Sequence, residues 1–380
     1  MIIEITGKED LFTLESKLTK GIKTPADEDV TVKLARNLRT DFFAEPRTVA
    51  LLATLANRGP LIVRDWHHQW DDGEIETHFR TALVGVGAMF LASKIKNIKG
   101  VPIPDARHSI LEQIAIRGGL LEPKYGTARS NSITICAFDP EWSEPAALAG
   151  KFKTKEAFKL ILSRYRRRYL EVGQGVPHTP VSRRADDQLG DFVFELFQNT
   201  IKHGRQSSDN AIMPGMRCVR MRKHFDYKDR FLSRAQGFEE LTNYLSEITP
   251  EKGQFKFYEI AVFDCGMGML GRFLNQRPEF KGSAESLGDQ VTLINRLLTQ
   301  PLTSTPDFPG AGYGLQKALA AISTLEGFVS LRTDRVWLCG HHAQKGDPLH
   351  KTGLRPVARQ EEFAPIVGTH FNILLPLRLS

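Results

Sequence analysis

The chain has 380 residues, of which 41% are hydrophobic and 25% charged, and a formal net charge of +7. This length favours two or three domains at roughly 100–200 residues per domain, and the composition excludes a disordered or fibrous protein. The positive charge is modest for this length and is compatible with nucleotide binding or with solubility alone.

The first part of the chain alternates between strand-like and helix-like segments. Strands are predicted at residues 30–38, 60–66 and 132–138, and helices at residues 45–59, 76–97 and 110–119. This alternation predicts an α/β domain over residues 1–148, for which we expect a sensor, partner-binding or dimerisation role. Residues 139–150, rich in proline and acidic residues, are the predicted linker.

From residue 151 the pattern changes, and a second domain is predicted over residues 151–380. Helices are predicted at residues 153–173, 185–204, 239–248 and 314–327, and strands at residues 216–225, 255–264, 328–334 and 368–377. This order predicts helices packed over one mixed sheet. The fold class predicted for the whole chain is α+β.

The sequence carries no sign of a membrane or secreted protein. The longest apolar run, residues 82–92, is shorter than the roughly 20 residues of a membrane helix. The start of the chain lacks the basic and apolar regions of a signal peptide, and the four cysteines form no CxxC pair. We therefore expect a cytoplasmic protein with reduced thiols.

The segment ELFQNTIKHG, residues 195–204, places polar residues in an apolar helix. Glu195, Asn199 and His203 follow at four-residue spacing, so they lie on one face of that helix. Such a stripe alone is more typical of a solvated helix edge. Its interpretation depends on the motifs that follow.

Three glycine-containing motifs follow this helix. In YEIAVFDCGMG, Asp264 ends a strand and a side-chain-free turn follows it; GTHFNILLPL places Thr369 at the start of the last strand. Between them, PGAGYGL precedes a helix whose N-terminus favours phosphate oxygens. The glycines are Gly266 and Gly268 in the first motif, and Gly310, Gly312 and Gly314 in the PGAGYGL motif.

In this order and spacing, the four motifs resemble the ATP-binding domain of the GHKL superfamily of gyrase, heat-shock chaperone, histidine kinase and mismatch-repair ATPases. The resemblance covers residues 150–380 and implies an α/β sandwich of the Bergerat type. It also implies that ATP and Mg²⁺ are the ligands. The ordered set is more specific than any single glycine motif.

The resemblance implies a role for individual residues. Asn199 would hold Mg²⁺ through its amide oxygen, and Glu195 would orient the attacking water as a base. Asp264 would accept a hydrogen bond from the adenine amine, with Thr369 supporting that contact. The other residues expected around the nucleotide are Lys202, His203, Gly266, Gly268, Gly310, Gly312, Gly314 and Leu315.

The leading functional prediction is an ATP-binding protein and slow, Mg²⁺-dependent ATPase that acts as a conformational switch. Nucleotide would order a lid over residues 269–309 and change contacts with the first domain or with a protein partner. Hydrolysis is expected to be slow because no transducer domain follows Leu377. Relatives in the superfamily commonly dimerise, so a homodimer is one alternative. Residues 205–255 are predicted to be an insertion.

Two other functions fit the sequence. A protein kinase acting in trans on a serine or histidine of a partner would use the same ATP site. A nucleic-acid-associated module, with ATP as a regulatory ligand, is the third alternative, because RYRRRY at residues 164–169 interleaves arginine with tyrosine. Most such basic runs are solvated helix faces.

Overall fold

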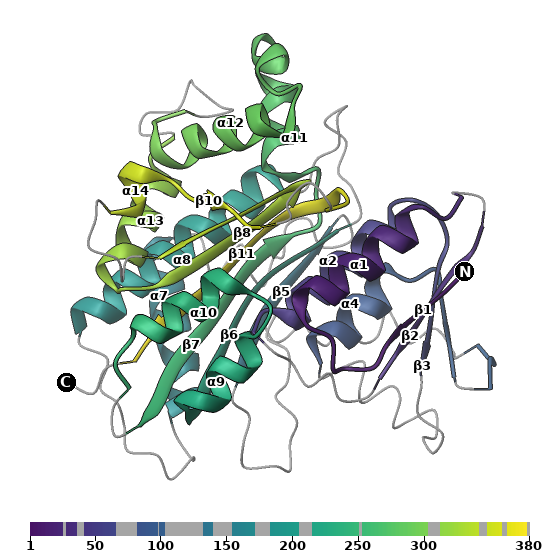
Figure 1. Ribbon diagram of the computed structural model, residues 1–380, viewed down its shortest axis with the longest axis horizontal. Coiled ribbons are helices and arrows are strands. Elements are labelled where there is room, and N and C mark those ends of the chain that lie inside the picture. The colour runs from purple at the N-terminus through teal and green to yellow at the C-terminus, as the bar shows by residue number, and fades with distance from the viewer. Residues whose placement is uncertain are drawn as a thin grey trace.

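The fold is described from a computed structural model of the chain. It describes residues 1–25, 28–35, 42–65, 82–97, 99–102, 132–139, 154–171, 183–204, 215–250, 253–302, 312–341, 348–358 and 363–377. These residues form a parallel and an antiparallel β-sheet, with helices between and outside them (Figure 1). The predicted α+β class is therefore confirmed.

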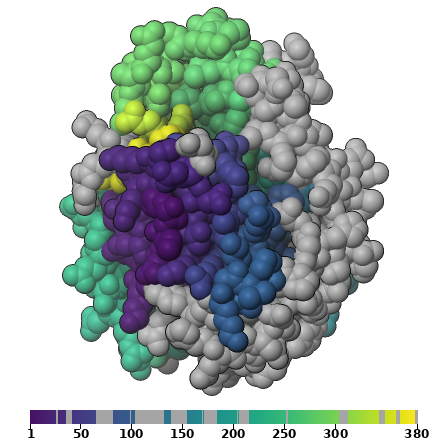
Figure 2. Space-filling model, turned by 90° about the vertical axis from the view of Figure 1, so that its right-hand side faces the viewer, coloured from purple at the N-terminus to yellow at the C-terminus, as the bar shows by residue number. Residues whose placement is uncertain are grey.

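The N-terminal part is a parallel sheet with helices on one face. Its described strands are, in spatial order, β1 (Ile2–Ile5), β2 (Val30–Leu34), β3 (Leu61–Asp65) and β4 (Lys94–Lys96). The described helices between them are α1 (Leu11–Ile22), α2 (Ala44–Ala56) and α4 (Leu83–Leu91). Each strand pairs with the next one in the sequence, and crossover connections between parallel strands are right-handed. The connecting helices therefore lie on one face of the sheet. These helices lie between the two sheets in Figure 1, and in Figure 2 this layer is purple to blue, below the green α11 and α12.

Local sequence explains the ends of these helices. Asp10 caps α1, because its side chain accepts a hydrogen bond from the backbone N–H of Thr13 at 2.6 Å. The predicted helix over residues 76–97 is too long: α4 ends at Leu91, and Lys94–Lys96 form β4. Lys-Ile-Lys has the two-residue period of a strand, whereas the preceding apolar run is helical. Residues 76–81 and the predicted helix at 110–119 lie outside the described residues.

The C-terminal part is built on a larger sheet. Among the described residues its spatial order is β10 (Arg355–Pro356), β9 (Val336–His341), β8 (Phe328–Asp334), β11 (Ile366–Pro376), β7 (Gln254–Asp264), β6 (Gly215–Tyr227) and β5 (Ser132–Asp139). Every pair of neighbours in this order is antiparallel. The predicted mixed sheet is therefore wrong in this respect, because hairpins such as β8–β9 replace parallel crossovers.

Helices cover both faces of this sheet. One face packs against the helical core formed by α7 (Lys155–Tyr165), α8 (Arg183–His203), α11 (Gly268–Gln276), α12 (Leu287–Thr299), α13 (Gly314–Thr324) and α14 (Leu349–Thr352). The other face packs against the N-terminal layer and against α9 (Lys228–Ala235) and α10 (Glu239–Glu247). A π-helix at Arg166–Glu171 and a 3₁₀ helix at Pro278–Ser283 complete the described helical segments. Along β7, Ile260 and Val262 face the first core, whereas Ala261 and Phe263 face the N-terminal layer.

The predicted boundary near residue 150 lies outside the described residues. Strand β5 precedes that boundary in the sequence, yet it pairs with β6 at the edge of the larger sheet. Strand β6 and helices α9 and α10 come from the predicted insertion at residues 205–255, where they supply one sheet strand and part of a covering layer. The described part of the insertion, residues 215–250 and 253–255, thus contributes to the hydrophobic core.

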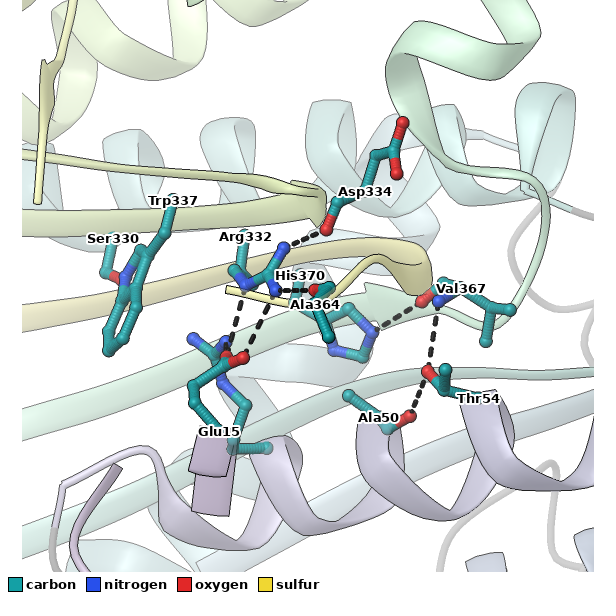
Figure 3. Close-up of polar contacts among 11 residues, drawn as sticks. Glu15, Ala50, Thr54, Ser330, Arg332, Asp334, Trp337, Ala364, Val367 and His370 are labelled. Atoms are coloured by element: carbon teal, nitrogen blue, oxygen red, sulfur yellow. Dashed lines mark hydrogen bonds and ion pairs between the residues drawn. The ribbon is translucent and has the colours of Figure 1, made fainter. Parts of the chain in front are cut away.

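Buried charges join the N-terminal layer to the larger sheet (Figure 3). Glu15 of α1 pairs with Arg47 of α2, and its oxygens accept two hydrogen bonds of 3.1 Å from Arg332 of β8. The three side chains are at most 2% exposed. Close by, the hydroxyl of Thr54 accepts a hydrogen bond from the backbone N–H of Val367 at 3.1 Å. Polar contacts therefore fix the position of α1 and α2 against β8 and β11.

His370 is buried at this interface and makes the stability of the protein sensitive to acid. Burial first, and then the charge of Arg47, lower the pKa of His370 from 6.5 to about 3. Between these values the unfolded chain binds a proton that the folded chain excludes, so the free energy of unfolding falls as the pH falls.

We expect His370→Gln to flatten this dependence between pH 6.5 and 5 by at most about 1.4 kcal/mol per pH unit. Glutamine keeps a donor for the carbonyl oxygen of Val367, which the ring nitrogen approaches at 3.3 Å. Urea unfolding at several pH values measures the slope. His224, whose pKa burial also lowers, keeps its own contribution in both proteins. An unchanged slope would contradict the assignment to His370.

Candidate functional site

A cavity lies where α8, the end of β7, the first turns of α11 and α13, and β11 meet. Nine of the described residues that the motifs predicted for the site line this cavity: Glu195, Asn199, Lys202, Asp264, Gly268, Gly312, Gly314, Leu315 and Thr369. Gly266 forms the adjoining turn, while Gly310 and the side chain of His203 lie outside the described part of the chain. Residues from four separate motifs thus surround one space.

Asp264 ends β7 in a tight turn where three backbone segments converge. Its Oδ1 accepts a hydrogen bond from the backbone N–H of Gly266 at 3.0 Å. A Cβ on Gly204 would lie 2.4 Å from Asp264 Cγ, and one on Gly266 would lie 2.2 Å from the carbonyl oxygen of Gly204. A Cβ on Gly368 would lie 1.8 Å from the carbonyl oxygen of Asp264. Glycine is therefore required where α8, β7 and β11 approach one another.

Thr333 of β8 connects two walls of the cavity. Its hydroxyl accepts a hydrogen bond from the backbone N–H of Met269, in the first turn of α11, at 3.1 Å, and donates one to the carbonyl oxygen of Gly368 at 3.1 Å. Gly368 immediately precedes Thr369. Thr333 was missed by the sequence analysis, because nothing in its strand distinguishes it from an ordinary buried threonine.

The N-terminus of α13 forms another side of the cavity. This helix begins at Gly314, and Gly312 before it has a φ of +92°, in the left-handed region that favours glycine. Oε2 of Glu195 lies 3.0 Å from the point where a Cβ on Gly314 would stand. The backbone amides and dipole of a helix N-terminus stabilise an anion. The place therefore suits either a carboxylate or phosphate oxygens.

Lys155 of α7, a helix that the sequence did not place at the site, forms an ion pair with a residue of the cavity wall. Its Nζ lies 3.4 Å from Glu195 Oε1 and 3.3 Å from Asp191 Oδ1. One turn later, Lys159 pairs with Asp191 at 2.9 Å and with Asp187 at 3.3 Å. The signal that would have found this contact is the matching four-residue spacing of lysines on one helix and acids on the next.

The remaining walls are mostly apolar. Leu196, Val262, Phe273 and Phe371 line the cavity, together with Arg272 of α11. Arg272 is buried, and this burial lowers the pKa of its guanidinium. A mainly apolar cavity with a few convergent polar groups is the usual form of a small-molecule site.

The basic run at residues 164–169 does not present all of its arginines to solvent. Arg166 is buried and donates a hydrogen bond to Asp186 of α8 at 2.6 Å. Arg167 is exposed and lies 3.6 Å from the other carboxylate oxygen of Asp186. Arg166 therefore joins the π-helix that follows α7 to α8 and is not placed to contact a nucleic acid.

Within the part of the chain that the structure describes, no helix has the length and apolar character to cross a membrane. The same residues contain no group of three or more His, Cys, Asp or Glu side chains arranged to hold a metal ion. The chain matches no family model, no curated protein and no solved structure. Its function is therefore inferred from the geometry and chemistry of the cavity.

Proposed function

We propose that this cavity binds ATP with Mg²⁺, and that the protein is a slow ATPase that works as a nucleotide-controlled switch. The observation that carries the proposal is that the described residues of four motifs, distant in the sequence, line one cavity. These are the motifs that resemble the GHKL superfamily, whose ATP-binding domain has the Bergerat-type fold.

The adenine ring of ATP would lie at the Asp264 end of the cavity. The hydrogen bond from Gly266 fixes the orientation of the carboxylate, which then accepts a hydrogen bond from the exocyclic amine of adenine. Thr369 lines the same end, and Val262 and Phe371 offer apolar surface to the ring. Thr333 keeps this end in shape through its contacts with Met269 and Gly368.

The phosphates would lie at the N-terminus of α13, where Gly312 and Gly314 line the cavity; Lys202 is a further lining residue with a positive charge. Asn199 lines this part of the cavity and carries an amide oxygen, a ligand that Mg²⁺ accepts, and Glu195 lies one helical turn earlier on the same wall. Mg²⁺ in nucleotide sites commonly takes one or two protein ligands together with phosphates and waters, which fits this small donor set. When bound, the metal would neutralise charge on the phosphates. Asn199 would hold it, and Glu195 would accept a proton from the attacking water.

Asn199→Ala tests the metal contact. We expect ATP affinity in the presence of Mg²⁺ to fall about tenfold, equivalent to about 1.4 kcal/mol, because one metal ligand is lost. With a chelator in place of Mg²⁺, wild type and variant should bind ATP alike. Isothermal titration calorimetry measures both conditions.

The control is Asn243→Ala, which removes an exposed asparagine on α10, across the sheet from the cavity. It should bind ATP as wild type does with and without Mg²⁺. If Asn199→Ala keeps wild-type affinity and metal dependence, the site assignment is wrong.

A protein kinase acting in trans is the second candidate. The side chain of Glu195 is 26% exposed, so it is not sealed from solvent, as phosphate transfer to a partner's side chain would require. Incubation of labelled ATP with co-purifying proteins separates the two functions. Label on a partner favours the kinase, and free phosphate alone favours the ATPase.

A further inference from the structure

We infer that Lys155 is a positioning residue for Glu195, and that through it helix α7 controls turnover at the proposed ATP site. The inference rests on the proposed function, because it concerns the acid that would orient water. Lys155 lies outside all four motifs, and its ion pair with Glu195 joins α7 to the wall of the cavity.

The carboxylate of Glu195 lies between Lys155 and the first turn of α13. Oε1 lies 3.4 Å from Lys155 Nζ, and Oε2 faces the first turn of α13 at Gly314. A bound phosphate needs the same helix terminus, so Oε2 must leave it when nucleotide enters. The ion pair with Lys155 then sets the orientation of the carboxylate toward the water.

The position of Lys155 is fixed by the packing of α7. Thr154 caps this helix by accepting a hydrogen bond from the backbone N–H of Ala157 at 3.2 Å, which puts Lys155 at the first helical position. Phe158 is buried against Phe194 and Phe197 of α8, at ring distances of 5.5 and 5.8 Å. Movement of α7 along α8 would carry Lys155 away from Glu195. A partner or domain contact that shifts α7 would therefore change the rate of turnover.

The neighbouring lysine provides a matched comparison. Lys159 lies one turn further along α7 and shares Asp191 with Lys155, but its second partner is Asp187 in place of Glu195, and neither aspartate lines the cavity. Both lysines are partly exposed, and ion pairs of this kind contribute little to stability. A difference between their variants thus reports on Glu195 and not on the docking of α7.

The test compares Lys155→Ala, Lys155→Arg and Lys159→Ala in the full chain with ATP and Mg²⁺. For Lys155→Ala we expect kcat for phosphate release to fall about tenfold, as a misplaced catalytic group would cause, while ATP affinity stays within about twofold. Lys155→Arg should recover most of the rate because it restores the cation. Lys159→Ala should behave as wild type. In a Glu195→Gln background, Lys155→Ala should have no further effect, because residues that act as a unit are not additive.

Other outcomes overturn the inference and separate it from the proposed function. Wild-type turnover in Lys155→Ala, an equal loss in Lys159→Ala, or a further loss in the Glu195→Gln background would each reject the positioning role and leave the ATP site in place. If the wild-type protein binds ATP but releases no phosphate, the positioning role is likewise rejected and the ATP site is retained. Wild type that does not bind ATP would reject the proposed function itself.

Discussion

Glu195→Gln is expected to lower the rate of ATP hydrolysis by about 10²–10⁴, the loss typical of removing a general base. Affinity for ATP should be unchanged or slightly higher. The base acts in the transition state and not in ground-state binding, and the negative carboxylate lies beside Gly314, at the helix terminus where the phosphates are proposed to bind. Glutamine keeps the size of the side chain and removes only its charge and its basicity.

Steady-state phosphate release gives kcat, and calorimetry gives the ATP affinity of the same preparation. Asp187→Asn is the matched control, because Asp187 lies two turns earlier on α8 and pairs with Lys159, away from the cavity. It should retain wild-type turnover. Hydrolysis at the wild-type rate in Glu195→Gln would exclude Glu195 as the base and leave a protein that binds nucleotide or transfers phosphate by another route.

The residues around the cavity were predictable where a local backbone feature demands a residue type. Asp264 stands at the end of a strand, and in the turn after it Gly268 has a φ of +81°, in the left-handed region that favours glycine. The four-residue spacing of Glu195 and Asn199 likewise predicts one helix face, and that face lines the cavity. Such features are visible in sequence because they depend on neighbours a few positions away.

Contacts between distant elements were not predictable in the same way. Lys155 and Thr333 become part of the site only because α7 packs on α8 and β8 lies beside β11. Strand direction was missed for a related reason. Alternating helices and strands favour parallel pairs, but β8 and β9 form a hairpin around Arg335, and β5 joins the sheet from the N-terminal side of the predicted boundary.

The buried charges between the layers are a second feature without a local signal, and they predict a large loss of stability. Glu15→Gln is expected to lower the free energy of unfolding by about 3–5 kcal/mol, because it leaves Arg47 and Arg332 buried without their counter-charge. Burial raises the pKa of Glu15, but the two arginines outweigh it, so the net pKa is lowered. The stabilisation from this carboxylate is therefore present above its ordinary value of 4.5 and lost as the pH falls below it.

Denaturant unfolding followed by circular dichroism measures this loss, and Glu4→Gln is the matched control. Glu4 pairs with Lys33 at 2.8 Å on the surface of the same N-terminal layer, and its side chain is 47% exposed. Its replacement should cost no more than about 1 kcal/mol.

Replacing Glu15, Arg47 and Arg332 together by apolar residues should recover much of the stability lost in Glu15→Gln, since no uncompensated charge then remains buried. A Glu15→Gln protein as stable as Glu4→Gln would show that the two arginines find other compensation. Because Arg332 adjoins Thr333, which holds Met269 and Gly368 at the cavity, we also expect Glu15→Gln to weaken ATP binding under conditions where it remains folded.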